Sequence, residues 1–193
     1  MKNLIIAAAF TAASFSITSC SNNSGTNTGS QTTTSETSTS PAAAEENKGN
    51  PSVKAILDNY LRLKDALAND SGDEAAKSGE ALATSFTNFD KSSLTDEQKK
   101  KYEEIAESAT EHAEHIGKNA SNIAHQREHF DMLSKDVYDI VKEVGAGQTL
   151  YQAHCPMYNN NKGASWLTAS KEINNPYMGM EMSTCGTIQE ELN

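Results

Sequence analysis

Two short pairs of sulfur-bearing residues near the C-terminus could together bind a soft metal ion. Cys155 and Met157 lie two residues apart around a proline, so both side chains can face one point only in a turn. Met182 and Cys185 are three residues apart, the spacing that brings side chains together on a helical turn. Thiolates and thioethers are ligands that select Cu(I). These four residues are a candidate copper site, with the adjacent His154 as an optional fifth ligand.

The same two cysteines allow a second interpretation. In an oxidising compartment Cys155 and Cys185 would form a disulfide, which would stabilise the fold by about 3–4 kcal/mol on the loop-entropy model. The disulfide and the metal site can interconvert with redox state. A redox protein that cycles Cys155 and Cys185 is less favoured, because the cysteines lack the close spacing and basic surroundings that lower a thiol pKa. The nearby Met178 and Met180 could serve as ligands or only as packing.

Four of the five histidines form a second candidate metal site. His112 and His115 are three residues apart, and His125 and His129 are four apart, so each pair can share one helix face. If the chain reverses near Ala120, His115 falls opposite His125 and His112 falls opposite His129. Histidine sites between helices bind Zn(II) or Cu(II). The alternative is a solvated helix face on which histidine is mixed with glutamate and lysine.

Other kinds of chemistry find little support in the sequence. It contains no Ser-His-Asp order, HExxH, glycine-rich phosphate loop or CxxC motif. The adjacent carboxylates of 103–104 and 190–191 would diverge on a helix and are typical of a solvated face. The formal net charge of -10 disfavours a nucleic-acid partner, because phosphate binding needs a basic face. We therefore expect neither an enzyme nor a nucleic-acid-binding protein.

Residues 1–20 have the features of an export signal. A basic start and an apolar run over 4–17 lead to Cys20, which follows small residues as in bacterial lipoprotein signals. We expect Cys20 to be lipidated and to become the mature N-terminus; the alternative is an ordinary cleaved secretory signal. The apolar run is too short for a stable transmembrane helix. The predicted location is the cell envelope, with a lipid anchor in the membrane and the domain facing the periplasm.

Two regions follow the signal. Residues 21–50 are mostly Ser, Thr, Asn, Gly and Ala and are predicted to be a flexible tether. Residues 51–193 are expected to form one folded domain, with a helical bundle over 51–147 and a Cys- and Met-rich strap over 148–193. The first helix should begin at Pro51 and break at 69–72, where turn-forming residues gather.

The remaining helices are predicted from capping signals and apolar periodicity. Ser71 and Glu74 form a candidate capping box for the second helix, and Thr95 and Gln98 form one for the third. The fourth helix should cover 123–144 and end at two glycines. Short connections favour a mainly α fold with an antiparallel four-helix bundle. The alternative is one long helix that continues through the glycine at 117.

The strap over 148–193 is rich in turn-forming residues. A short strand is predicted over 150–154, and the rest is expected to be an irregular strap packed on the bundle. Trp166 and Leu167 should be buried as its anchor. Arg127 should form a buried or half-buried ion pair that holds the strap to the bundle.

Two blocks of the chain resemble a known bacterial domain. The first block is His112 to Ile116 continued by Ile123 to Ser134, and the second joins His154–Met157, Gly163–Leu167 and Asn175–Gly186. They resemble a domain of unknown function from lipoproteins of Bacteroidetes-type bacteria. That domain is also attached to periplasmic adaptor subunits of heavy-metal (copper/silver) efflux pumps.

The resemblance implies a helical periplasmic domain connected with metal efflux. Cys155, Met157, Met182 and Cys185 match its motif positions, and the partner it implies is a heavy-metal efflux adaptor or another envelope protein. We therefore expect a lipid-anchored protein that binds a soft metal, copper before zinc. The alternative is a disulfide-stapled structural or interaction module that docks to an envelope or efflux partner without metal chemistry.

Overall fold

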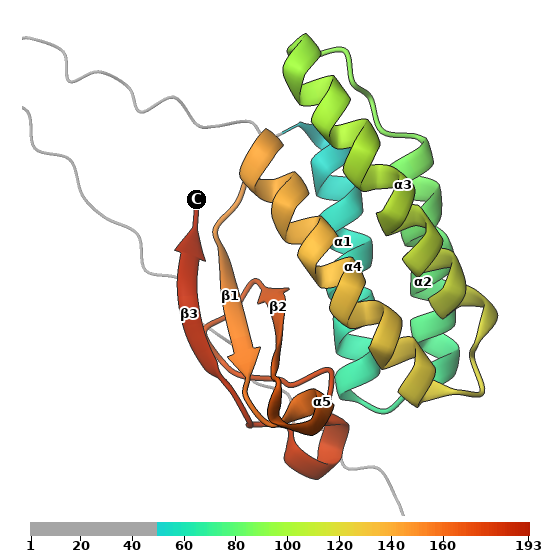
Figure 1. The fold of residues 1–193 in the computed structure, drawn as a ribbon, viewed down its shortest axis with the longest axis vertical. Coiled ribbons are helices and arrows are strands. Elements are labelled where there is room, and N and C mark those ends of the chain that lie inside the picture. The colour runs from blue at the N-terminus through green and yellow to red at the C-terminus, as the bar shows by residue number, and fades with distance from the viewer. Residues whose placement is uncertain (1–49) are drawn as a thin grey trace, which may run out of the picture. The chain divides into compact units, whose positions relative to one another are not determined.

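The computed structural model describes residues 50–193, which contain four long helices followed by a small antiparallel sheet (Figure 1). The helices are α1 (Pro51–Ala68), α2 (Gly72–Thr87), α3 (Asp96–Lys118) and α4 (Ile123–Val144). The predicted mainly helical class and the packed four-helix arrangement are confirmed. The predicted signal over 1–20 with Cys20, and the tether up to residue 49, lie outside the described residues.

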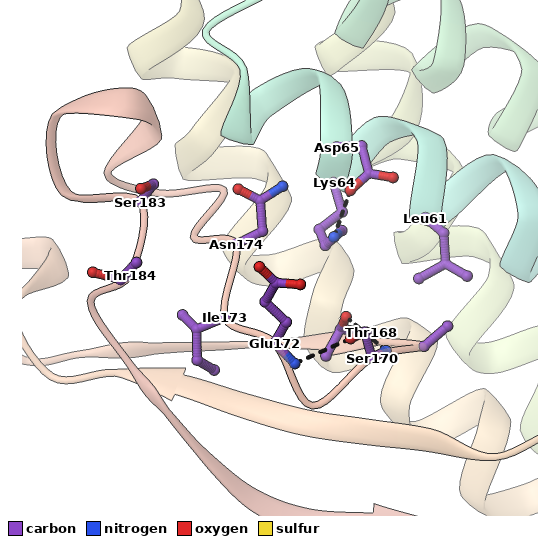
Figure 2. A pocket seen from close by; sticks show the side chains of 11 residues that line it. Leu61, Lys64, Asp65, Thr168, Ser170, Glu172, Ile173, Asn174, Ser183 and Thr184 are labelled. Carbon is purple, nitrogen blue, oxygen red and sulfur yellow. Dashed lines mark hydrogen bonds and ion pairs between the residues drawn. The ribbon is translucent and has the colours of Figure 1, made fainter.

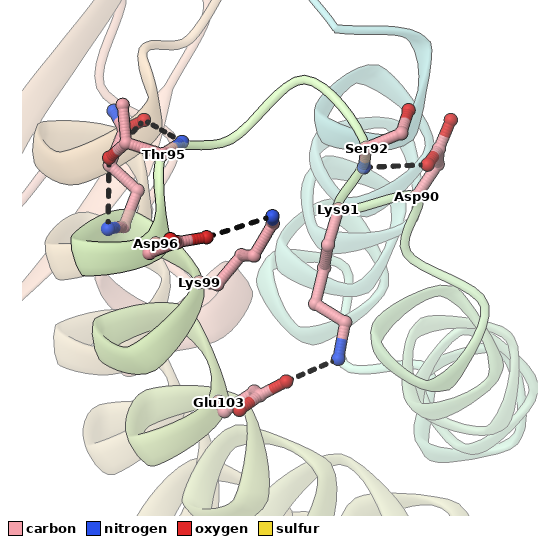
Figure 3. A network of polar contacts seen from close by, with 8 residues as sticks. Asp90, Lys91, Ser92, Thr95, Asp96, Lys99 and Glu103 are labelled. Carbon is pink, nitrogen blue, oxygen red and sulfur yellow. Dashed lines mark hydrogen bonds and ion pairs between the residues drawn. The ribbon is translucent and has the colours of Figure 1, made fainter.

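Local capping explains where the helices begin. Asn50 accepts a hydrogen bond from the Ser52 amide (2.8 Å) at the start of α1, where Pro51 occupies the first turn. The predicted capping box of α3 is present: Gln98 N–H donates to Thr95 Oγ1 and Thr95 N–H donates to Gln98 Oε1 (Figure 3). Beside it, Lys91 and Glu103 form an ion pair between the α2–α3 connection and α3.

Two other sequence predictions about the helices had different outcomes. The capping box at the start of α2 was wrong, because the Ser71 side chain makes no capping hydrogen bond and Glu74 pairs with Lys77 instead. A single long helix through Gly117 is excluded. The chain turns over 119–122, and the Asn122 side chain accepts from the His125 amide (3.2 Å) to begin α4. This reversal makes α3 and α4 antiparallel neighbours.

The C-terminal region is more regular than the predicted irregular strap. It contains β1 (Leu150–Cys155), the short turn α5 (Tyr158–Asn161), β2 (Ala164–Thr168), the 3-10 turn η1 (Gly179–Met182) and β3 (Thr187–Leu192). The expected strand over 150–154 is confirmed as β1, which lies between β2 and β3 in an antiparallel sheet. The sheet lies beside the bundle, with β2 packed against α4 (Figure 1).

A buried polar contact joins this sheet to the bundle. Tyr60 of α1 is fully buried, and its hydroxyl lies 2.8 Å from Ser134 Oγ of α4 and accepts from the Leu167 amide of β2 (3.0 Å). Trp166 and Leu167 are buried as predicted. The apolar layer around them is continuous from the helices into the sheet. Three elements therefore share one core.

Arg127 holds the C-terminal region to the bundle, as the sequence predicted. Its guanidinium pairs with Asp70 (2.5 Å) and donates to the carbonyls of Leu67 (2.8 Å) and Pro176 (2.7 Å). Asp70 also accepts from the Met180 amide (2.9 Å). The Arg127 side chain is 13% exposed, so the contact is half-buried. It links the α1–α2 turn, α4 and η1.

Among residues 50–193, none of the helices combines the length and the apolar character that a membrane span requires.

Candidate metal centre

The four histidines predicted from helix spacing lie together between α3 and α4. Nδ1 of His112 is 3.1 Å from Nδ1 of His129, and the rings of His115 and His125 are 6.2 Å apart between centroids. The ring of His129 also stacks on His115 (4.4 Å) and meets His125 edge-on (4.5 Å). The pairing predicted for a chain reversal near Ala120 is therefore what the fold produces. Because His129 contacts all three of the other rings, it is the centre of the cluster.

Three of these imidazoles are close enough to share one ion. His115, His125 and His129 each offer a ring nitrogen, and these three nitrogens lie within 4.8 Å of one another. Two nitrogens bound to one tetrahedral Zn(II) at 2.0–2.1 Å would be about 3.3 Å apart. Small side-chain rotations would close that difference. The arrangement fits a borderline divalent ion such as Zn(II) or Cu(II).

The electrostatic surroundings hold the central ring of the cluster, His129, in the neutral form that binds metal. Burial and the neighbouring histidines lower the pKa of His129 to about 4, so this ring is neutral at pH 7. Nδ1 of His125 lies 3.3 Å from a carboxylate oxygen of Glu128, and Nε2 of His115 lies 3.9 Å from Glu111. Carboxylates in such positions orient a ligating ring and raise its basicity. Imidazole rings held by outer carboxylates are typical of metal ligands.

The two cysteines of the sulfur set also lie together. Sγ of Cys155, at the end of β1, is 3.1 Å from Sγ of Cys185, which precedes β3. Both thiols are free, with Cys155 buried and Cys185 half-buried. Although burial opposes ionisation, hydrogen bonds from Cys185, the Met157 amide and Asn175 lower the pKa of Cys155 overall. The hydrogen bond to Cys155 raises the pKa of Cys185. Cys155 is therefore the thiol that ionises first.

The other members of the predicted sulfur site differ from one another in exposure and position. Met157 is 47% exposed and Met182 is half-buried in η1. His154 neighbours Cys155 along β1, so their side chains point to opposite faces of the sheet. Its Nδ1 lies 3.1 Å from Ser165 Oγ on β2. The geometry supports the pairing of Cys155 with Cys185 and separates His154 from it.

Met178 and Met180 belong to the methionine-rich segment around η1, and they differ in exposure. Met178 is half-buried, and Met180 is 68% exposed beside Asp70. The described structure thus brings together three histidine nitrogens within 4.8 Å of one another and, separately, two thiols 3.1 Å apart.

The roles of two polar residues near these sites were not predicted from the sequence. Asn175 is fully buried, donates to the Cys185 carbonyl (2.6 Å), and accepts from the amides of Tyr177 (2.8 Å) and Met178 (3.1 Å). It shapes the turn that brings Cys185 to Cys155; the Asn-Pro sequence was its only local signal. Asp136 of α4 lies half-buried on the side of the helix that faces α3. Its hydrogen-bond partner Ser108 lies on another helix, so no local pattern in the sequence indicated this position.

A separate cavity of about 490 Å³ lies between α1 and the segments after β2 and η1 (Figure 2). Lys64, whose side chain is 7% exposed, borders it and pairs with Asp65 (2.5 Å). The carboxylate of Glu172 and several hydroxyl groups also line it. Its lining carries one cationic and two anionic side chains, and it holds none of the histidines, cysteines or methionines considered above. It is distinct from the candidate metal centre.

Comparison with known proteins relates part of the chain to a protein family. Residues 56–149 match the model of a family described as "Protein of unknown function (DUF3347)". The matched region covers nearly all of the four helices, including the four clustered histidines, whereas both cysteines lie beyond it. No curated protein and no solved structure matches the chain.

Proposed function

We propose that this chain, whose helical region carries the DUF3347 match, binds a divalent transition metal between α3 and α4, copper before zinc. The observation that carries the proposal is the set of three ring nitrogens, from His115, His125 and His129, within 4.8 Å of one another. Imidazole suits both ions, and Cu(II) binds such sites more tightly than Zn(II). Together with the export signal that the sequence predicts up to Cys20, this favours envelope copper handling as a buffer, chaperone or sensor.

In this proposal, the two cysteines give the protein a second state that depends on the redox conditions. When oxidised, Cys155 and Cys185 would staple β1 to the segment before β3. When reduced, the same thiolates could hold Cu(I), the soft ion that sulfur ligands select. Metal held by the histidines would be independent of that change, because the histidine ligands carry no sulfur.

A titration of the purified protein with Cu(II) and Zn(II), against a competing chelator, tests the proposal. The key variant is the double substitution His115→Ala/His129→Ala, with His154→Ala as the matched histidine control outside the cluster. We expect one ion per chain for the wild type and for His154→Ala. The double variant should lose at least about 100-fold in affinity, because two of the three imidazole ligands are gone.

The oxidised and reduced protein, and the Cys155→Ser/Cys185→Ser variant, should be titrated in parallel. Equal Cu(II) binding by all three supports the histidine site. Tight copper binding by the reduced wild type alone would move the site to the thiols and overturn the assignment to the helices. Weak, equal binding by every variant would leave no metal function to propose.

A second candidate function is an interaction module, stapled by the disulfide and docking to an efflux adaptor or another envelope protein. It is favoured by three exposed methionines, Met132, Met157 and Met180, since flexible methionine side chains suit adaptable contacts. Capture of such a partner that is unaffected by copper and by the state of the cysteines would support this function. Loss of capture when copper is removed would favour metal handling.

A further inference from the structure

His112 meets the histidine cluster in a way that differs from the other three histidines. Close ring contacts join His129 to both His115 and His125, and these two also meet each other. Among the close ring contacts within residues 50–193, His112 has one, with His129. The three nitrogens that lie within 4.8 Å of one another belong to His115, His125 and His129. His112 is therefore outside the set that can share one ion.

The contact between His112 and His129 is made by two nitrogens that point at each other. Their Nδ1 atoms are 3.1 Å apart, whereas the ring centres are 5.3 Å apart. The difference is close to the sum of two ring radii, so both nitrogens lie near the line that joins the ring centres. A separation of 3.1 Å is a hydrogen-bond length. Because two lone pairs would repel each other here, one of the nitrogens must carry a proton.

The direction of this hydrogen bond decides which nitrogen of His129 can bind a metal ion. A neutral imidazole has one N–H group and one nitrogen with a free lone pair. If Nδ1 of His129 accepted the bond, the proton would be on Nε2 and would block it. If Nδ1 donates the bond to His112, Nε2 keeps its lone pair. The two nitrogens lie on nearly opposite sides of the ring, so Nε2 then faces away from His112.

A partner of this kind is expected for a metal-bound histidine. A ligating imidazole almost always donates its second N–H to an acceptor, which fixes the tautomer and the orientation of the ring. The carboxylates of Glu128 (3.3 Å) and Glu111 (3.9 Å) lie beside the two outer rings of the cluster. Within the described residues, the central ring of His129 has His112 as its hydrogen-bond partner instead.

We propose that His112 is a positioning residue of the metal centre and not one of its ligands. Its Nδ1 accepts the hydrogen bond from Nδ1–H of His129, which leaves Nε2 of His129 for the ion that His115 and His125 share. This inference rests on the proposed function, because it needs these three histidines to bind the ion. It reduces the four-histidine site predicted from the sequence to three ligands and gives the fourth histidine a separate role.

Nuclear magnetic resonance of the isotope-labelled whole protein identifies the nitrogen through which each ring binds zinc. When Zn(II) is added, we expect Nε2 of His129 and one nitrogen each of His115 and His125 to show the shift of a metal-bound imidazole. Nδ1 of His129 should stay protonated, and neither nitrogen of His112 should bind the ion. Zinc bound to His112, or to His129 through Nδ1, would overturn the inference.

Two substitutions separate a hydrogen-bond acceptor from a ligand. His112→Asn places an amide oxygen near the position of Nδ1 and keeps an acceptor, whereas His112→Ala removes it. We expect His112→Ala to weaken Cu(II) and Zn(II) binding by about 10–100-fold in a chelator competition. His112→Asn should bind with nearly the wild-type affinity, because an acceptor is still present. The matched control His154→Ala should change neither affinity.

The remaining outcomes divide between this inference and the proposed function. An equal loss of affinity in His112→Asn and His112→Ala would show that His112 is a ligand, and no loss in either would show that it has no role at the centre. Both results would overturn this inference alone. If His112→Ala does not fold, the spectrum of the zinc-bound wild type decides between the two roles. A wild type that binds no metal would overturn the proposed function together with this inference.

Discussion

The hydroxyl group of Tyr60 connects three elements of the fold, α1, α4 and β2. It lies 2.8 Å from Ser134 Oγ and accepts from the Leu167 amide, and all three groups belong to buried residues. A buried donor that loses its partner retains the full cost of having left water. The joint between α1, α4 and β2 therefore depends on a hydroxyl as well as on the aromatic ring that carries it.

Tyr60→Phe should lower the free energy of unfolding by about 1–3 kcal/mol, because the Leu167 amide and the Ser134 hydroxyl lose their partner without leaving the core. Urea denaturation followed by circular dichroism measures the change. Tyr138→Phe is the matched control: its hydroxyl donates to Glu190 (2.7 Å) on a half-exposed surface where water can replace it. An equal loss in both variants would contradict the special role of Tyr60.

At the residue scale, the sequence predicted the histidine cluster better than the sulfur site. Helix periodicity alone places His112 opposite His129. Once a short turn joins two antiparallel helices, each residue of the second helix lies opposite a known residue of the first. The sulfur site depends on contacts across about thirty residues of turns and strands, which spacing does not describe. Asp136 escaped notice for a related reason: a single carboxylate in a polar stretch has no local signal of burial.

At the scale of elements, the placement of the histidines depends on how closely α2 and α3 pack. A Cβ added at Gly79 of α2 would lie 2.8 Å from the Ala113 carbonyl and 3.1 Å from the Gly117 amide of α3. Both contacts are with backbone, which cannot rotate away. The glycine thus allows α3 to approach α2 in the same stretch that carries His112 and His115.

Gly79→Ala should destabilise the protein by about 1–2 kcal/mol, because overpacking of about 1–3 kcal/mol exceeds the gain in helix propensity of about 1 kcal/mol. It should also weaken metal binding by displacing α3 against α4. Thermal unfolding and the chelator competition measure the two effects. Lys77→Ala, at an exposed position of α2, should change both little. A Gly79→Ala variant that is more stable than the wild type would show that the gain in helix propensity outweighs the cost of overpacking between α2 and α3.

The pairing of the three strands into a sheet could not be predicted from the sequence. The sequence of β1 has recognisable apolar positions, whereas the sequence of β3 is mostly polar and charged. In the fold, the side chains of β3 alternate between exposed and less exposed positions. Its charges are matched only after folding, when Glu190 meets Tyr138 and Lys142, and Glu191 meets Lys171. Because β1 pairs with a strand almost forty residues later, the partner cannot be recognised from local pattern.

At the scale of the whole described region, the Arg127–Asp70 pair connects the part that matches the family model with the part that does not. Arg127 lies within residues 56–149, and its Pro176 contact and the Met180 contact of Asp70 lie beyond them. The C-terminal region also carries both clustered cysteines. The region that carries the two thiols is therefore joined by direct contacts to the helix that presents His125 and His129.

The pair also makes the stability of this connection dependent on pH. The hydrogen bond from Arg127, followed by that from the Met180 amide, holds the pKa of Asp70 below its ordinary value. A carboxyl whose pKa is lower in the folded state binds fewer protons than in the unfolded chain. Its contribution is present above the unfolded pKa of about 4 and is lost as the pH falls through the folded value.

We therefore expect the free energy of unfolding of Asp70→Asn to be lower than that of the wild type by a constant amount between pH 5 and 8. The difference should shrink below about pH 4, where the wild-type carboxyl is also protonated. Arg127→Met should cost about 1.5–3 kcal/mol at pH 7, since it removes hydrogen bonds to a charged group. Urea denaturation across the pH range measures both. A wild-type-to-variant difference that stays constant down to pH 2 would show that Asp70 acts through its shape and not through its charge.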